Sequence, residues 1–173
     1  AWESGDPHWG IWQLPESKLE LFPNDLKGKK CIEIGCGAGY VSSWMARRGA
    51  EVVGIDPTPN QLETARLLEK QYQLGIEFIE GFGEKLPFPD SCFDFAISEY
   101  GASLWANPYE WIPEAARVLK QGSQLVFMTN HAFTICCVPD EENENVPISE
   151  QLQRPYLGLF KTQWKSSPHE IEF

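Results

Sequence analysis

The sequence predicts an α/β fold with a doubly wound, mostly parallel sheet and helices on both faces. Short apolar segments suited to buried strands alternate along the chain with longer segments of helical periodicity. The first apolar segment, 31–34, leads directly into a turn that contains Gly35, Gly37 and Gly39. The second apolar segment ends at Asp56, about 20 residues after the first glycine, which is the spacing of a ribose-binding acid in a strand–helix–strand unit.

The glycine turn is typical of a site where a nucleotide-like cofactor lies against the backbone. Glycine has no Cβ, so the chain can approach a ligand closely and can adopt left-handed torsion angles. The dinucleotide fingerprint G-x-G-x-x-G has its third glycine where this sequence has Tyr40. Glu33 stands near the end of the strand before the turn. A carboxylate there repels a pyrophosphate and suits a cationic ammonium group.

The other elements follow from local signals. Gly49 ends the helical pattern that follows the turn. Thr58 and Pro59 predict a second helix, because Thr is a cap residue and Pro suits the first helical turn. Pro113 would interrupt a helix begun at Asn107, so we expect the third long helix to start at Pro113. The expected strands are 31–34, 52–55, 76–79, 93–98 and 125–128, and the expected helices are 38–48, 58–74 and 113–120.

Composition indicates a single domain that acts on a small molecule. The length of 173 residues suits one domain. Acidic residues number 25 against 14 basic ones, for a formal charge of −11, so nucleic acid is a poor partner. The five cysteines have neither metal-ligand spacing nor the pattern of a disulfide framework, and neither a signal peptide nor a membrane span is present. We therefore expect a cytoplasmic protein without a metal site, nucleic acid or membrane partner.

Five features follow one another along the chain: EIGCGAG at 33–39, the strand ending at Asp56, LPFPDSCFD at 86–94, the strand 93–98 and AARVLKQGSQLVF at 115–127. In this order they resemble the class I S-adenosylmethionine-dependent methyltransferases. The resemblance covers about residues 29–130 and implies the fold of that family. It also implies that S-adenosylmethionine lies across the carboxyl ends of the first, second and fourth strands and that its methyl group passes to a small-molecule acceptor.

The same resemblance implies roles for individual residues. It places Glu33 at the methionine end of the cofactor, directly or through water, and Asp56 at the ribose. Family members often carry an acid for the adenine amino group where this chain has Phe82, which leaves adenine recognition to backbone groups near Gly83 and Glu84. The expected cofactor-binding residues are Glu33, Gly35, Cys36, Gly37, Gly39, Asp56, Pro57, Gln61, Gly83, Glu84 and Ser98.

Glu99 and Tyr100 follow the fourth strand at its carboxyl end, where ligands of an open α/β sheet collect. We predict Glu99 as the catalytic base, needed only if the acceptor nucleophile carries a proton, and Tyr100 as a positioning group. Packing of Tyr100 on the cofactor is an equal alternative. Two other classes stay open: a non-catalytic sensor or subunit that binds S-adenosylmethionine or S-adenosylhomocysteine, and a nicotinamide-dependent oxidoreductase, which Tyr40 argues against.

Aromatic residues are concentrated at the start of the chain. Prolines and glycines interrupt residues 1–28 too often for a long helix, and we interpret this segment as a cover for the domain 29–135. His8, Trp9 and Trp12 are expected to fold over the pocket as a lid that excludes water. Packing of these side chains into the core is the alternative.

The end of the chain has too few strands for the resemblance. Class I methyltransferases normally have seven strands, whereas this sequence has five clear ones and a short candidate at 170–173. We therefore expect 136–173 to be the irregular, incomplete end of the same domain, in a truncated or incompletely described protein that lacks the last strands. Otherwise the apolar edge at 125–128 is covered by residues 146–173 or by a second copy in a homodimer.

Overall fold

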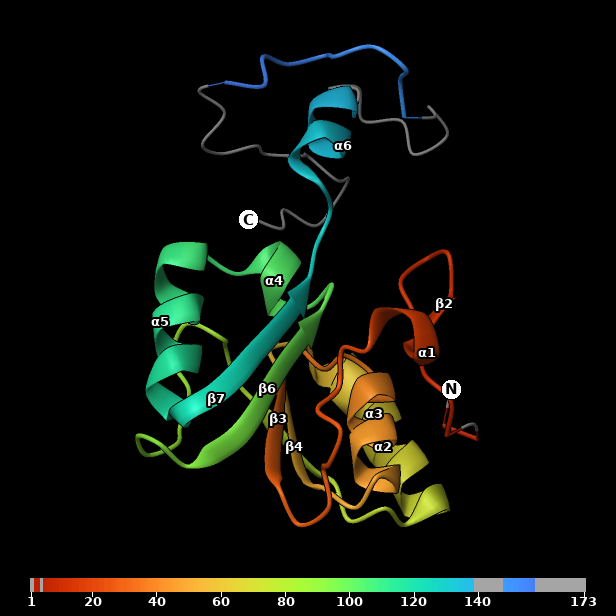
Figure 1. Cartoon of the computed structure of the whole chain (residues 1–173), viewed down its shortest axis with the longest axis vertical. Coiled ribbons are helices and arrows are strands. Elements are labelled where there is room, and N and C mark those ends of the chain that lie inside the picture. Colours follow the sequence, from red (N-terminus) through yellow and green to blue (C-terminus); the bar gives the residue numbers. More distant parts are fainter. Residues whose placement is uncertain (1, 4, 139–147, 158–173) are drawn as a thin grey trace. The chain divides into compact units, whose positions relative to one another are not determined.

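The computed structural model describes residues 2–3, 5–138 and 148–157. Contacts between Cα atoms divide the chain into two compact units, Ala1–Met128 and Thr129–Phe173. The first unit contains the N-terminal segment 1–28 together with all strands of the main sheet (Figure 1). Candidate strand 170–173 lies outside the described residues.

A five-stranded sheet forms the centre of the first unit. All neighbouring strands are parallel, in the order β5-β4-β3-β6-β7. Within this sheet the chain forms the central strand, β3, first, then builds outward on one side and returns to build outward on the other. This confirms the predicted α/β fold. The strand order reverses between β3 and β6, and ligands of open α/β sheets collect at the carboxyl ends beside such a reversal. The strands are β3 (Lys30–Ile34), β4 (Glu51–Asp56), β5 (Glu77–Glu80), β6 (Phe93–Glu99) and β7 (Leu119–Met128).

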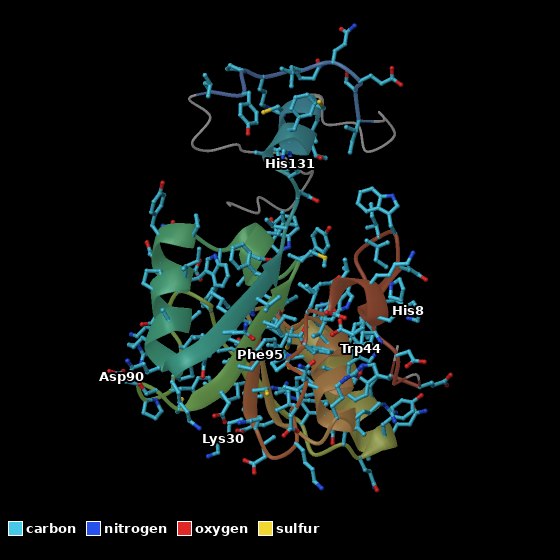
Figure 2. All side chains as sticks on the ribbon, viewed as in Figure 1. His8, Lys30, Trp44, Asp90, Phe95 and His131 are labelled. Carbon is cyan, nitrogen blue, oxygen red and sulfur yellow. The ribbon has the colours of Figure 1, made fainter. Side chains whose placement is uncertain are left out.

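Helices cover both faces of this sheet (Figure 1). Adjacent residues of β3 point to opposite faces, so Cys31 packs in one core cluster and Ile32 in the other. Trp44 and Phe95, labelled in Figure 2, belong to the same cluster as Cys31, which also contains Leu62. The helices are α2 (Tyr40–Arg47) and α3 (Pro59–Tyr72) on that face, and α4 (Ala102–Trp105) and α5 (Pro108–Val118) on the other.

Helix α5 begins at Pro108, so the predicted start at Pro113 is wrong. Asn107 caps the helix, because its side chain accepts a hydrogen bond from a backbone N–H of the first turn. Trp111 and Ala115 lie on either side of Pro113 and are both buried in the same core cluster. The cap and the continuous apolar face outweigh the single backbone hydrogen bond that Pro113 cannot make.

Strand β7 begins immediately after α5, at Leu119, which is earlier than the predicted 125–128. It pairs with β6 through a register shift: Phe93 opposes Leu119, whereas Phe95 opposes Gln124. Among the described residues, β7 is the last strand on this side of the sheet, and Phe127 near its end is 47% exposed. The second unit contains α6 (Ala132–Cys137).

The N-terminal segment forms a small antiparallel hairpin of β1 (His8–Trp9) and β2 (Leu14–Pro15), followed by α1 (Glu16–Leu19). Trp9 is 1% exposed, and its ring meets those of Phe22 and Trp44 edge-on. For Trp9 the lid prediction is therefore wrong and the core alternative is correct. His8 is exposed and Trp12 is 75% exposed.

Candidate cofactor-binding site

Strand β4 holds the glycine turn that connects β3 to α2. The backbone N–H groups of Gly35 and Cys36 both donate to the carbonyl oxygen of Ile55, at 2.8 and 3.0 Å. The N–H of Gly37 donates to Oδ2 of Asp56 at 2.8 Å. The turn and the acid, two separate signals in the sequence, are thus one hydrogen-bonded unit.

The three glycines of the turn are required for different reasons. All have positive φ, at 77°, 50° and 74° for Gly35, Gly37 and Gly39. A Cβ on Gly35 would lie 2.2 Å from the backbone nitrogen of Ala102, and a Cβ on Gly39 would lie 2.6 Å from the ring of Phe78. A Cβ on Gly37 would meet no atom closer than 3.8 Å. Internal packing therefore requires glycine at positions 35 and 39, whereas at Gly37 only the positive φ favours glycine and the space beside its Cα is open.

Gly101 lies next to the candidate site and is not among the predicted site residues. A Cβ on Gly101 would lie 2.1 Å from the carbonyl oxygen of Gly35. These two backbones touch just after β6 and β3, at the point where the strand order reverses. The available signal was a glycine two residues after the end of β6, where a close backbone approach needs the missing Cβ.

Glu33 is buried in β3, two residues before the glycine turn. Its side chain is 3% exposed, and its Oε2 accepts hydrogen bonds from both the backbone N–H and the hydroxyl of Ser42 in α2. Burial raises the pKa of Glu33 to about 8; the Ser42 hydrogen bonds lower this pKa, while the charges of Glu99 and Asp56 raise it. A cationic group that reached Glu33 would favour its carboxylate form.

We expect Glu33→Gln to reduce the pH dependence of stability. The pKa of Glu33 in the folded chain is about 8, whereas that of a free glutamate is 4.5. Between these values the folded state binds more protons, so the contribution of Glu33 to stability is fully present below the lower value and is lost as pH rises towards the upper one. Urea unfolding of both proteins at about pH 5 and about pH 8 measures the difference.

The control for this experiment is Glu77→Gln, which replaces an exposed glutamate at the start of β5. The free energy of unfolding should decrease between about pH 5 and about pH 8 by the same amount in this control as in the unaltered chain. If the free energy of unfolding of the Glu33→Gln variant decreased by as much as that of the unaltered chain, the assignment of a raised pKa to Glu33 would be contradicted.

Asp56 has two acceptor positions left for a ligand. Its Oδ2 accepts from Gly37 and its Oδ1 accepts from the backbone N–H of Thr58, each at 2.8 Å. An ionised carboxylate has about four lone-pair positions, so each oxygen can accept one more hydrogen bond. The two vicinal hydroxyls of a ribose match that pair of acceptors.

Three other predicted residues are Pro57, Gln61 and Glu84. Pro57 and Gln61 are exposed, and Oε1 of Gln61 is the atom nearest to the position of a Cβ on Gly37. Glu84 is half-buried and its Oε1 accepts from the backbone N–H of Asn107 at 3.0 Å. This hydrogen bond ties the loop after β5 to the start of α5.

Three of the predicted contact residues have no side chain free to reach a ligand. Cys36 is 5% exposed and its Sγ lies beside Gly54 of β4. Gly83 is buried against Ile34, and the hydroxyl of fully buried Ser98 donates to the carbonyl oxygen of Ile34 at 2.7 Å. From these positions only backbone groups can contact a cofactor.

Glu99 and Tyr100 lie where the N-terminal hairpin meets the end of β6. The N–H of Gly10 donates to Oε1 of Glu99 at 2.9 Å. A Cβ on Gly10 would lie 3.6 Å from the ring and from the hydroxyl of Tyr100. Tyr100 has a φ of 50°, which is uncommon for a large side chain, and its N–H donates to the carbonyl oxygen of Met128. The backbone of β7 and the hairpin thus hold this pair on two sides.

The fold and the site together define an α/β protein with polar groups and an open glycine turn gathered at the carboxyl ends of two neighbouring strands. Glu33 lies on β3, Gly37 lies in the turn that follows it, and Asp56 ends β4. Within the described residues, no group of three or more His, Cys, Asp or Glu side chains is placed to hold a metal ion.

Residues 32–127 match the protein family described as "Methyltransferase domain". The chain belongs to this family, which confirms the resemblance found in the sequence. It is 37% identical over 117 residues to 2-methyl-6-phytyl-1,4-hydroquinone methyltransferase 2 of Oryza sativa subsp. japonica, covering 65% of this chain and 33% of the relative. It is 32% identical over 105 residues to fatty-acid O-methyltransferase of Mycolicibacterium smegmatis, covering 60% and 38%.

A solved structure with the same fold is that of the YcgJ protein from Bacillus subtilis, which superposes with a TM-score of 0.58 at 28% identity. This match covers 60% of the present chain and 45% of the solved one. The chain therefore spans about a third to a half of the length of these relatives.

Proposed function

We propose that this chain binds S-adenosylmethionine and transfers its methyl group to a small-molecule acceptor that carries an apolar chain. The observation that carries this proposal is the unit formed by Gly37 and Asp56. It combines a glycine with an open side and a carboxylate with two unused acceptor positions at the carboxyl edge of the sheet. Membership in the methyltransferase domain family supports the identity of the cofactor.

The relatives support an apolar acceptor. Their names give a phytyl hydroquinone and a fatty acid as the molecules that they methylate. Both molecules combine a polar head with an apolar chain.

The chain's own groups have simple tasks in such a transfer. S-adenosylmethionine supplies an activated methyl group on its sulfonium. Asp56 accepts hydrogen bonds from the ribose hydroxyls, and Glu33 attracts the cationic end of the cofactor. Glu99 uses Oε1 to hold Gly10, so its Oε2 remains to take a proton from the acceptor nucleophile. Tyr100 positions the acceptor beside it, and the hairpin excludes water from this end.

The proposal also covers the location and the partners of the protein. All five cysteines are free, which supports the cytoplasm as its location, and the excess of acidic residues argues against nucleic acid as a partner. None of the helices in the described part of the chain has the length and apolar character needed to cross a membrane. Pairing of two copies along β7 is supported by its position as the last described strand of the sheet.

The experiment that tests the function is a transfer assay with methyl-labelled S-adenosylmethionine. Incubation with a lipid extract and with a water-soluble metabolite extract is expected to yield labelled product in the lipid fraction. Glu99→Gln is expected to lower product formation at least about tenfold while leaving cofactor affinity within about twofold, since Glu99 acts on the acceptor. Cofactor binding without labelled product in either fraction would instead indicate a non-catalytic sensor or subunit.

A further inference from the structure

The turn of the N-terminal hairpin presents large apolar side chains to solvent. Ile11 and Trp12 occupy the two central positions of a turn closed by a hydrogen bond from the N–H of Gln13 to the carbonyl oxygen of Gly10. Ile11 is 78% exposed and Trp12 is 75% exposed, and Leu14 directly after the turn is 40% exposed. Adjacent exposed apolar residues of this size are typical of binding surfaces.

The hairpin that carries these side chains is firmly anchored. The carboxylate of Glu16 accepts hydrogen bonds from Nε1 of Trp9 at 2.6 Å and from the N–H groups of Leu21 and Phe22 at 3.3 and 2.8 Å. Trp9 itself is buried against Phe22 and Trp44. The exposure of the turn is therefore imposed by the packing of its base, and the turn offers a preorganised apolar surface.

The turn lies next to the end of the site where the acceptor is expected. Gly10, its first residue, donates a hydrogen bond to Glu99, and a Cβ on Gly10 would lie 3.6 Å from Tyr100. Ile11 and Trp12 follow Gly10 directly in the chain, so they neighbour the residue that is bonded to the proposed base.

We infer that Ile11 and Trp12 bind the apolar chain of the methyl acceptor and select acceptors by the length of that chain. This inference rests on the proposed function. Two observations favour a small apolar molecule over a lipid surface. Residues 8–15 contain no Lys or Arg, and the chain has a formal charge of −11, whereas binding to an anionic lipid surface depends on basic residues. The relatives that methylate a phytyl hydroquinone and a fatty acid also point to this occupant.

The test compares the binding of 4-methylphenol and 4-octylphenol, below the aggregation limit of the latter, in the presence of S-adenosylhomocysteine. Burial of about three methylene groups of the octyl chain should make its dissociation constant roughly 50-fold lower. In the double variant Ile11→Ala and Trp12→Ala, the ratio is expected to fall to about fivefold or less. Leu67→Ala, which removes an exposed apolar side chain from α3, is the matched control and should keep the ratio of the unaltered chain.

Three outcomes would overturn the inference. The first is an unchanged ratio in the double variant, and the second is no dependence on alkyl length in the unaltered chain. The third is binding to phosphatidylglycerol vesicles that is lost in the double variant, together with phenol binding that does not depend on alkyl length. This result would assign the turn to a lipid surface. Titration of S-adenosylhomocysteine alone separates these results from a failure of the proposed function, because the double variant should bind it within about twofold of the unaltered chain.

Discussion

Replacing Gly35 with Ala is expected to lower the free energy of unfolding by about 2–6 kcal/mol. A positive φ on a residue with a Cβ costs about 1–3 kcal/mol, and overpacking of a close contact costs about 1–3 kcal/mol more. The new Cβ would lie 2.2 Å from the backbone nitrogen of Ala102 and 2.6 Å from Cα of Gly101. Neither atom belongs to a side chain that can rotate away, so the loop after β6 would have to move.

Gly75→Ala separates the two contributions in this prediction. Gly75 has a φ of 79°, close to the 77° of Gly35, but a Cβ on it would meet no atom within 4 Å. Urea unfolding should therefore show a loss of only about 1–2 kcal/mol for Gly75→Ala, the cost of the left-handed backbone alone. Equal losses for the two variants would show that the close approach of Gly35 to Gly101 adds nothing to the cost of a Cβ at position 35.

Asp56→Ala is expected to weaken binding of S-adenosylmethionine at least about tenfold, because each hydrogen bond to a charged group contributes about 1.5–3 kcal/mol. The structure shows that this substitution also removes the hydrogen bonds to Gly37 and Thr58. A lower affinity alone would therefore not separate the ribose contact from a loosened turn.

A second ligand separates the loss of the ribose contact from the loosening of the turn. If Asp56 contacts the ribose, the unaltered chain should bind the 2′,3′-dideoxy analogue of S-adenosylmethionine at least about tenfold more weakly than the natural cofactor. The chain with Asp56→Ala should bind both with similar affinity, because the partner of the hydroxyls is already gone. A persistent preference of this variant for the natural cofactor, measured by calorimetry, would remove Asp56 from the ribose site.

The central sheet was predictable because its signals are local. Buried parallel strands appear as short apolar runs, and the glycines and caps between them mark the turns. The errors arose where tertiary packing outweighs a local rule. Pro113 lies inside α5 because Trp111 and Ala115 bury the same face on both sides of it. Trp9 is a core residue because Phe22 and Trp44, distant in sequence, enclose it.

The sequence proposed the residues of the candidate site, but it could not show the hydrogen bonds and backbone contacts between them. The spacing of the glycines and of Asp56 indicated a cofactor, yet the hydrogen bond between Gly37 and Asp56 depends on the pairing of β3 with β4. The contact of Gly10 with Glu99 joins residues far apart in the sequence, and no local pattern encodes it. The backbone contact of Gly35 with Gly101 likewise depends on the pairing of β3 with β6.

Calorimetric titration of the chain with S-adenosylmethionine tests the central claim most directly. We expect saturable binding of one cofactor per chain, and a large excess of the oxidised nicotinamide dinucleotide should not compete with it. Binding is also expected to release protons between about pH 5 and pH 8, because the cationic cofactor favours the carboxylate form of Glu33. The absence of binding to the folded chain, or equal affinity for the nicotinamide dinucleotide, would contradict the assignment of this edge of the sheet to S-adenosylmethionine.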